Sequence, residues 1–524
     1  MTEKSGYSGL VRTLGLRDVT SFGISATLGS GILVSVGYMA KFHTGPSVAI
    51  CFALVVLVVL LSALCFAEFA GRVHTSGVGY AYATYVYGDI VGFCVGVITF
   101  VSYCFGSAAG ARGFAQYLGC FVFAFSGIEL PQWLIGFPLP GSPFNVSVIA
   151  PVLCGLATLV SVSGAKNSAF VSNALVLMNL SLMIIFIIYG TSQYGDSDLL
   201  SPWTIPSIGW RGVLDASGSA FFCLIGWELT CSLSEEVKRP SRNLPTGIIS
   251  TLIIVGCIYC AVSLTLSVMV PYDLINTQAP VAYAFLFHGD ARMYLVVSFV
   301  ASTVCVSNVL SSSIGTPRVV YAMARDGHLF DSLATLSPTT NVPFKAAIVC
   351  GVINMIGSGL FDFESLAKIT SCMTLLIYAS VSGGVLVLRK PSATSPLLVP
   401  ALILFSITSI IFQFNLLNPI SPNSSLTWIL GLFNLISALI VFVVYQNASR
   451  TSALQSPLIA TGKPLLSQEK DDIFNCPMVP VVPLLAVWTN LFVIASMGIQ
   501  TFTAAISLPI LSALYYKFTH RSSG

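Results

Sequence analysis

The 524-residue sequence has few charged side chains. Asp, Glu, Lys and Arg together make up 8% of it, against about 25% in soluble domains. So few charges cannot cover the surface of a globular protein in water. Hydrophobic residues make up 55% of the chain and its mean hydropathy is +0.88. This composition excludes soluble enzymes and predicts a polytopic protein whose surroundings are the lipid bilayer.

The sequence also lacks the residue patterns of a nucleic-acid site, of a catalytic or metal site, and of a disulfide framework. The net charge is only +3, and no basic run is longer than Lys238–Arg239 or Arg389–Lys390, so a nucleic-acid partner is not expected. The five histidines are scattered among loops and chain ends, and they form no catalytic or metal-binding group with other side chains. The 14 cysteines lie almost entirely in apolar segments, where a thiol acts as a small hydrophobe. We therefore expect no enzyme activity, no cofactor and no metal.

The apolar runs predict fourteen transmembrane helices, with boundaries uncertain by several residues. Their expected ranges are 20–40, 46–70, 88–120, 147–163, 169–190, 213–233, 246–270, 280–314, 344–361, 366–388, 397–416, 426–446, 478–496 and 498–517. No signal peptide precedes the first helix, so the N-terminus is expected in the cytosol. An even number of helices then returns the C-terminus to the same side.

The distribution of basic residues supports this orientation. Of the 23 Lys and Arg residues, Lys41, Arg211, Arg292 and Lys368 fall in outer segments and Arg112 lies in or near helix 3, which leaves 18 inside. Two glycosylation sequons, at Asn145 and Asn423, fall in outer loops under the same count.

The longest polar stretch divides the chain. We expect a transport core over residues 1–390 (helices 1 to 10), helices 11 and 12 within 391–446, a cytosolic linker over 447–477, and helices 13 and 14 with the C-terminal tail over 478–524. The linker is too short and too poor in apolar residues to bury a core of its own.

Helix 1 contains more glycine than an uninterrupted span needs. Its run GISATLGSGILV includes Gly29, Ser30 and Gly31. Unwound backbone within a membrane is tolerated where it lines a cavity, and the ends of half-helices there can bind a carboxylate or an ammonium. The alternative is close helix packing through small residues.

A second interruption favours the binding site. Helix 6 contains Gly226, Trp227 and Glu228 inside an otherwise apolar span. Breaks in the first helices of two five-helix units are typical of inverted-repeat transporters, which bind substrate between the repeats. The expected fold is therefore an all-α polytopic membrane protein with a 5+5 inverted-repeat core, broken at helices 1 and 6, plus four further helices.

Several long motifs resemble the cationic amino acid transporters of the amino acid, polyamine and organocation superfamily. They are GISATLGSGILV, LCFAEFAGRVHTSGVGYAY (64–82), FFCLIGWELTCSLSEEVKRPSRNLPTGI (221–248) and PRVVYAMARDGHLF (317–330). The final pair of helices, around NCPMVPVVPLL, resembles the extra helices 13 and 14 of eukaryotic members.

The resemblance implies a substrate site made largely of backbone groups. The substrate carboxylate would bind at Gly29, Ser30 and Gly31, and its ammonium at the carbonyls of Phe222, Cys223 and Ile225. Ser102 matches a position near the helix 1 loop, although its hydroxyl could instead bond its own helix.

Selectivity for basic side chains would depend on two further residues. Ser312 in helix 8 takes the place where a relative for shorter substrates has a bulky residue, so it leaves room for a lysine-length or arginine-length group. Glu228 stands where most family members have Asp. A carboxylate in mid-span faces a cavity or a partner, so Glu228 either senses substrate charge or ties the half-helices together.

The resemblance also bears on the driving force through Asn179, and spacing suggests a gate at Glu68 and Arg72. Asn179 matches the helix 5 position that is a lysine in proton-coupled relatives, and asparagine cannot change charge. We therefore expect facilitative uniport of arginine, lysine and ornithine, driven by the membrane potential. Glu68 and Arg72 are one helical turn apart and could pair as part of a gate at the cytosolic mouth.

Three alternatives stay open. The protein could carry neutral or many kinds of amino acids, act as an amino acid sensor that has lost transport, or be a membrane enzyme. The plasma membrane is preferred over a lysosome-like compartment, and protein partners are unknown.

Overall fold

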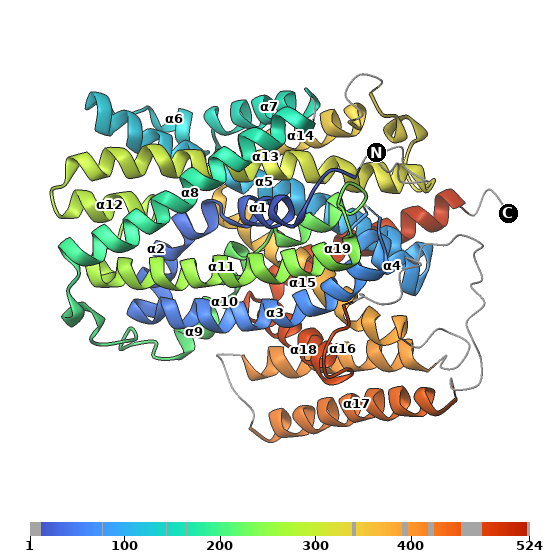
Figure 1. The fold of residues 1–524 in the computed structure, drawn as a ribbon. Helices are drawn as coiled ribbons and strands as arrows, with labels where there is room; N and C mark the ends of the chain where they lie inside the picture. Colours follow the sequence, from blue (N-terminus) through green and yellow to red (C-terminus); the bar gives the residue numbers. More distant parts are fainter. Residues whose placement is uncertain are drawn as a thin grey trace.

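A computed structural model describes residues 12–75, 77–142, 144–163, 165–337, 342–389, 397–417, 424–451 and 474–520. The described chain is almost entirely helical (Figure 1). Its named strands are β1 Phe137–Pro138 and β2 Asn145–Val146, which form one short antiparallel hairpin. The fold is therefore the all-α polytopic fold that the composition predicts.

Nine helices of the described chain are long and apolar enough to cross a membrane, and helical segments occupy all fourteen predicted ranges. The first seven are helix 1 (α1 Leu16–Thr27, η1 Gly31–Ser35, α2 Val36–Met39 and η2 Ala40–Thr44), helix 2 (α3 Val48–Arg72), helix 3 (α5 Asp89–Ser126), helix 4 (α7 Ile149–Val162), helix 5 (α8 Ala165–Tyr194), helix 6 (α10 Ser217–Cys223 and η5 Trp227–Leu233) and helix 7 (α11 Pro240–Met269). The others are helix 8 (α13 Ala291–Arg325), helix 9 (α14 Phe344–Leu360), helix 10 (α15 Phe363–Leu388), helix 11 (α16 Leu398–Leu416), helix 12 (α17 Ser424–Thr451), helix 13 (α18 Val481–Ser496) and helix 14 (α19 Ile499–His520).

Short elements connect these spans. They are α4 Gly79–Tyr87, α6 Gln132–Ile135, α9 Arg211–Asp215 and α12 Pro280–Phe287, with the one-turn helices η3 Gly45–Ser47, η4 Ser197–Leu200, η6 Tyr272–Leu274 and η7 Asp331–Ala334. The sequence did not lead us to expect α4. The first described residues and the last turns of α19 lie at one end of the bundle (Figure 1). We call this the inner end, after the orientation predicted from charge.

The prediction of one continuous helix over 280–314 is wrong. Gly289 takes a positive φ of 77° and ends α12, and the Asp290 side chain accepts a hydrogen bond from the Met293 amide to begin α13. Helix 8 then continues to Arg325, with Pro317 in its interior. Helix 12 likewise runs past its predicted end into the expected linker, most of which lies outside the described residues.

Helices 1 to 4 each pack against the helix five positions later in the chain. Helix 1 contacts helix 6, helix 2 contacts helix 7, helix 3 contacts helix 8, and helix 4 contacts helix 9. This pairing is the one that two interlocked five-helix repeats require.

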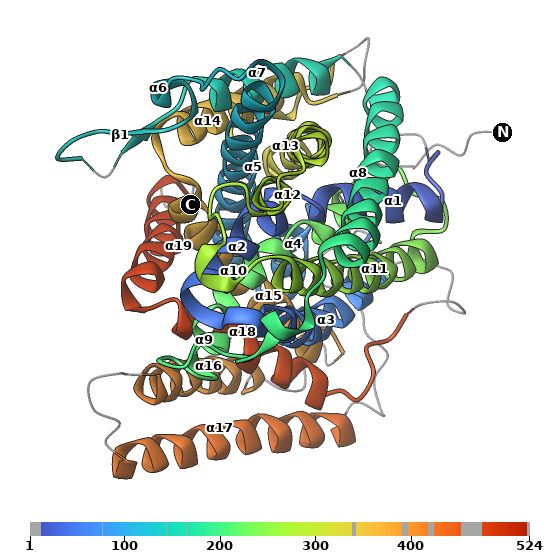
Figure 2. The same ribbon diagram turned by 90° about the vertical axis from the view of Figure 1, so that its left-hand side faces the viewer.

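Helices 11 to 13 are added to the core in an order that differs from their order in the chain. Helix 13 (α18) packs against α15 and α3 of the core, α16 packs on α18, and α17 packs on α16. Both views place α17 at the edge of the molecule (Figures 1 and 2). Helix 14 (α19) lies against α5 and α15. Helices 13 and 14 therefore pack directly on the core.

Candidate functional site

Helix 1 is interrupted between its inner and outer halves. The inner half, α1, ends at Thr27, and Leu28 has extended backbone angles of φ −68° and ψ 106°. The carbonyls at the end of a helix lack partners from their own helix. Here side chains supply some: the Asn308 amide donates to Ala26 O at 2.7 Å, and the Tyr259 hydroxyl donates to Thr27 O at 2.8 Å.

Helix 6 is interrupted in the same way. Its first half, α10, ends at Cys223, and Gly226 has a φ of 120° before the chain resumes as a 3₁₀-helix at Trp227. A residue with a side chain rarely adopts this φ, so the sequence needs glycine here. The Gly226 amide donates to Glu228 Oε2 at 2.9 Å, which satisfies one backbone group that the break frees.

The two breaks face each other at contact distance. A Cβ atom at Gly226 would collide with the carbonyl oxygen of Ala26, and a Cβ atom at Gly31 would lie 2.7 Å from the Cα of Cys223. Glycine at both positions is therefore a condition for this approach of the two backbones. The predicted pair of opposed broken helices is confirmed.

A cavity lies between the breaks. Its volume is about 40 Å³, well below the roughly 300–1,000 Å³ of small-molecule sites, so in this conformation it has room for a few water molecules only. Its walls are Ala26, Thr27, Gly29, Ser30, Gly31, Ser102, Tyr103, Gly106, Phe222, Cys223, Ile225, Gly226, Leu229, Asn308, Ser312 and Thr370. The structure thus brings together eight of the nine residues predicted to bind substrate, all except Glu228.

The helix ends give this cavity opposite charges at different walls. The inner half of helix 1 and the α10 half of helix 6 both end here, so their carbonyls present partial negative charge. The outer half of helix 1 begins here at Ser30 and Gly31, and the first amides of a helix present partial positive charge. This arrangement of partial charges suits a zwitterion, with its carboxylate at the amides and its ammonium at the carbonyls.

Glu228 does not line the cavity. Its side chain is buried, and its Oε2 accepts hydrogen bonds from the Gly226 amide and from the Tyr378 hydroxyl at 2.6 Å. The carboxylate therefore links the helix 6 break to helix 10. Among the described residues, the cavity wall includes no Asp, Glu, Lys or Arg.

Ser102 and Asn179 are both placed in the membrane interior, with different surroundings. The Ser102 hydroxyl lies 2.7 Å from Thr374 Oγ1 of helix 10, so the alternative that it bonds its own helix is wrong. Asn179 is buried in helix 5 away from the cavity wall. Within the described chain, neither amide atom of Asn179 has a hydrogen-bond partner.

The sequence prediction missed four polar residues of the wall, Thr27, Tyr103, Asn308 and Thr370. Asn308 carried a usable signal, because it is a polar residue in mid-span one helical turn before Ser312, and such residues mark functional surfaces. Tyr103 and Thr370 carried none, since hydroxyl residues are common in helices of this kind.

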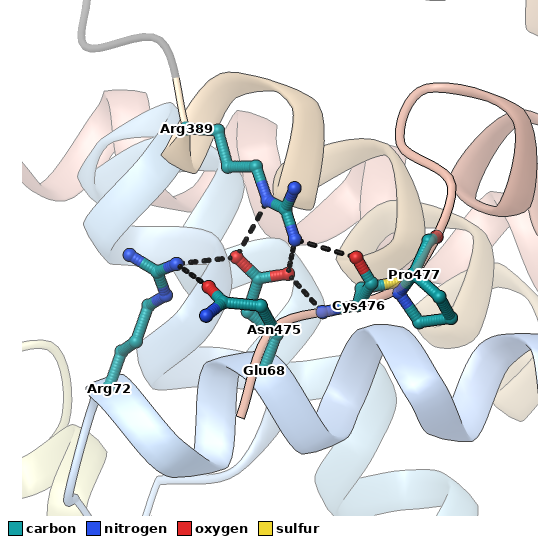
Figure 3. A network of polar contacts seen from close by, with 6 residues as sticks. All are labelled: Glu68, Arg72, Arg389, Asn475, Cys476 and Pro477. Carbon is teal, nitrogen blue, oxygen red and sulfur yellow. Dashed lines mark hydrogen bonds and ion pairs between the residues drawn. The ribbon is translucent and has the colours of Figure 1, made fainter. Parts of the chain in front are cut away.

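The predicted gate residues belong to a larger network at the inner end (Figure 3). The Glu68 carboxylate is fully buried and pairs with Arg72 at 2.9 Å. Arg389, at the end of helix 10, donates to both of its oxygens at 2.9 and 2.8 Å. The Cys476 amide donates to it as well, at 2.9 Å, and Asn475 accepts from Arg72 at 2.6 Å. Glu68 therefore joins helices 2 and 10 to the segment that precedes helix 13.

A second set of contacts closes around the end of helix 6. Arg318 of helix 8 pairs with Glu236 at 2.8 Å, and Arg325 pairs with Glu235 at 3.4 Å. The segment before helix 1 joins them, because Leu14 and Val237 form an isolated parallel bridge. The acidic residues that follow helix 6 are thus held by helix 8.

One sequon can be placed. Asn145 is partly buried in β2, and its carbonyl and side-chain oxygens accept hydrogen bonds from Arg112 of helix 3. Asn423 lies outside the described residues.

Comparison with known proteins gives consistent results. Residues 14–466 match the family described as amino acid permease, and residues 474–523 match the family described as its C-terminus. The chain is 32% identical over 392 residues to the methylthioribose transporter of Bacillus subtilis (strain 168), which covers 74% of this chain and 84% of the relative.

Two further relatives are cationic amino acid transporters by name. The vacuolar cationic amino acid transporter 4 of Arabidopsis thaliana is 32% identical over 401 residues, covering 74% of this chain and 65% of the relative. The cationic amino acid transporter 4 of Homo sapiens is 28% identical over 574 residues, covering 98% and 88%. All three relatives are transporters, which confirms that the chain is not an enzyme.

Proposed function

The chain belongs to the amino acid permease family, and we propose that it carries cationic L-amino acids such as arginine, lysine and ornithine by facilitative uniport. One observation supports the proposal most: the two broken helices face each other across a cavity whose walls carry opposite partial charges. These charges match the carboxylate and ammonium that every free amino acid carries. Alternating access to the two sides of the membrane would then move the bound substrate.

The preference for long basic substrates rests on the wall at helix 8. Ser312 is small and lies in the cavity wall, so it would not obstruct a long side chain once the site widens around the substrate. Because Glu228 is already bonded to Gly226 and Tyr378, a basic side chain would be accepted by hydroxyl, amide and carbonyl oxygens. The cationic amino acid transporters among the relatives support the same substrate class.

The membrane potential is sufficient as a driving force. A substrate of charge +1 gains about 2.3 kcal/mol per 100 mV of membrane potential. Tenfold accumulation requires about 1.4 kcal/mol, so about 60 mV suffices. By the resemblance of the motifs, Asn179 matches the position of a lysine in proton-coupled relatives, and because an amide does not titrate, this match supports uniport.

The remaining expectations are part of the same proposal. Both termini would lie in the cytosol, the plasma membrane is preferred as the location, and Asn145 and Asn423 would be glycosylated on the outer side. Residues 1–390 would form the transport core. The Glu68 network would act as part of a gate at the inner end, where it joins helices 2 and 10.

Labelled arginine uptake into proteoliposomes tests the proposal. An imposed inside-negative potential should increase the initial rate and the final accumulation, whereas a pH or sodium gradient should change neither. Leucine at the same concentration is the control, because a neutral substrate gains nothing from the potential. Arginine flux that does not respond to voltage would contradict electrogenic uniport.

A neutral or broad substrate range is the second candidate. It is favoured by the cavity wall, which has no acidic side chain among the described residues, and by the similarity to a methylthioribose transporter. Voltage-insensitive uptake of leucine that exceeds arginine uptake would select it. Arginine binding without any flux would instead indicate a sensor.

A further inference from the structure

Asn308 lies where helix 8 passes the break in helix 1. Its Nδ2 atom donates to Ala26 O at 2.7 Å, at the carbonyl end of the inner half-helix. A Cβ atom at Gly29 would lie 2.8 Å from the Asn308 Cγ, so glycine in the break also makes room for this side chain. The carboxamide therefore fills the gap between helix 8 and the interrupted backbone.

The orientation of the carboxamide is fixed. Turning it over would place Oδ1 against the carbonyl oxygen of Ala26, where two acceptors would repel each other. On the opposite side, a Cβ atom at Gly110 of helix 3 would lie 2.8 Å from Oδ1. Two glycines on different helices thus flank the side chain, and Oδ1 must point away from Ala26.

Among the polar side chains of the cavity wall, that of Asn308 is the most accessible from the cavity. Asn308 is partly exposed, whereas the hydroxyl residues of the wall are buried. Those buried residues are Thr27, Ser30, Ser102, Tyr103, Ser312 and Thr370. Among the described residues, no hydrogen-bond donor is paired with Oδ1, while Nδ2 is already bonded. A free acceptor in a cavity favours a ligand that brings a donor.

We infer that Asn308 positions the substrate, with its Oδ1 accepting a hydrogen bond from the α-ammonium of the bound amino acid. The inference rests on the proposed function only in that the ligand is an amino acid. Oδ1 points away from the Ala26 carbonyl, and the carbonyl ends of both half-helices line the same cavity, where an ammonium is favoured. Asn308 would therefore contact the α-ammonium of the substrate. Ser312, one turn further along helix 8, would lie beside the substrate side chain.

A double-mutant cycle between protein and ligand tests this inference. The inhibition constants of arginine and of 5-guanidinopentanoate, which lacks the α-amino group, are measured by competition against labelled arginine in the unchanged protein and in Asn308→Ala. We expect the substitution to weaken arginine about tenfold or more and to leave the analogue nearly unchanged. Equal weakening of both ligands would overturn the inference, because Asn308 would then act only by holding helix 1.

Two further variants keep the result interpretable. Asn308→Asp keeps an acceptor oxygen, so binding should still depend on the amino group, and loss of that dependence would also overturn the inference. Asn354 of helix 9 is a buried asparagine that bonds Ser107 and does not line the cavity, so Asn354→Ala should weaken both ligands equally or neither. If the chain carries neutral substrates, the same cycle is run with leucine and 4-methylpentanoate. In that case the proposed preference for basic substrates is wrong, and the cycle with leucine still tests the role of Asn308.

Discussion

Arg389 holds the buried carboxylate of Glu68 through two parallel hydrogen bonds, of 2.9 and 2.8 Å (Figure 3). The two residues are 321 positions apart in the chain, at the inner ends of helices 2 and 10. Because a bidentate pair fixes both position and orientation, it fastens these two helix ends together. Arg389 also donates to the carbonyl of Cys476 at 2.7 Å. This bond fastens the segment before helix 13 to the same two helix ends.

Removal of this carboxylate should destabilise the protein. Glu68→Gln leaves two guanidinium groups without their anion. We expect a loss of about 2 kcal/mol, less than the roughly 3–5 kcal/mol of a fully buried pair, because Arg72 and Arg389 are 25% and 24% exposed. Thermal unfolding in detergent measures the effect.

Glu364 is the matched control for Glu68. It pairs with Lys368 at the surface, where the side chains are 43% and 47% exposed, so Glu364→Gln should cost at most about 1 kcal/mol. Equal losses for the two variants would show that burial of Glu68 contributes nothing.

Glu228→Gln should reduce transport of basic and neutral substrates by the same factor. The carboxylate bonds Gly226 and Tyr378 and does not line the cavity, so its loss affects the break that both substrates share. Uptake of labelled arginine and of leucine gives the comparison. A selective loss of arginine transport would instead indicate that Glu228 senses substrate charge.

Gly226→Ala should abolish most transport. The added Cβ atom would collide with the carbonyl oxygen of Ala26, and φ at this position is 120°. Strained backbone of this kind costs about 1–3 kcal/mol, so we expect at least a roughly tenfold loss of uptake. Gly289→Ala is the control, since φ is 77° there but nothing lies within 4 Å. A Gly226→Ala variant as active as Gly289→Ala would contradict close contact of the breaks.

Ser312→Met should exclude long substrates selectively. A methionine side chain in the cavity wall would occupy the space proposed for a lysine or arginine side chain. Overpacking costs about 1–3 kcal/mol, so the KM for arginine should rise by about tenfold or more, while the KM for alanine should change little. A similar rise for both substrates would place the side-chain pocket elsewhere.

Stability should decrease in acid through His74, in the loop after helix 2. Burial and the positive charge of Arg12 lower the pKa of His74 from 6.5 to about 4. The folded protein therefore disfavours the protonated imidazole, so stabilisation present above about pH 6.5 is lost as pH falls toward about 4. The difference in Tm between pH 7 and pH 5 should be smaller in His74→Gln. An unchanged difference would exclude His74 as a cause.

Much of the site was predictable because its signals are local. Glycines at 29, 31 and 226 interrupt apolar runs that would otherwise be continuous helices, and an interrupted backbone in a membrane must line a cavity or be buried in protein. The expected number of spans is also a local signal, because each crossing needs about 20 apolar residues in a row. The resemblance of the motifs then identified which backbone groups meet.

Other features depend on contacts between distant segments. The sequence offered Arg72 as the partner of Glu68 because the two are one turn apart. Local spacing gave no indication that Arg389 and Cys476 also reach this carboxylate, because residue spacing along the chain does not show which loop packs over which helix end. The same limitation applies to helix 13, which the structure inserts between the core and helix 11.

The sequence by itself thus determined the class of protein and the positions of both breaks, because these follow from apolar composition and glycine placement along one chain. Only the tertiary structure decided that Glu228 is bonded inside the break and that Asn308 reaches the cavity. The direction in which a polar side chain points within a bundle depends on which neighbour offers it a hydrogen bond, and that neighbour comes from another helix.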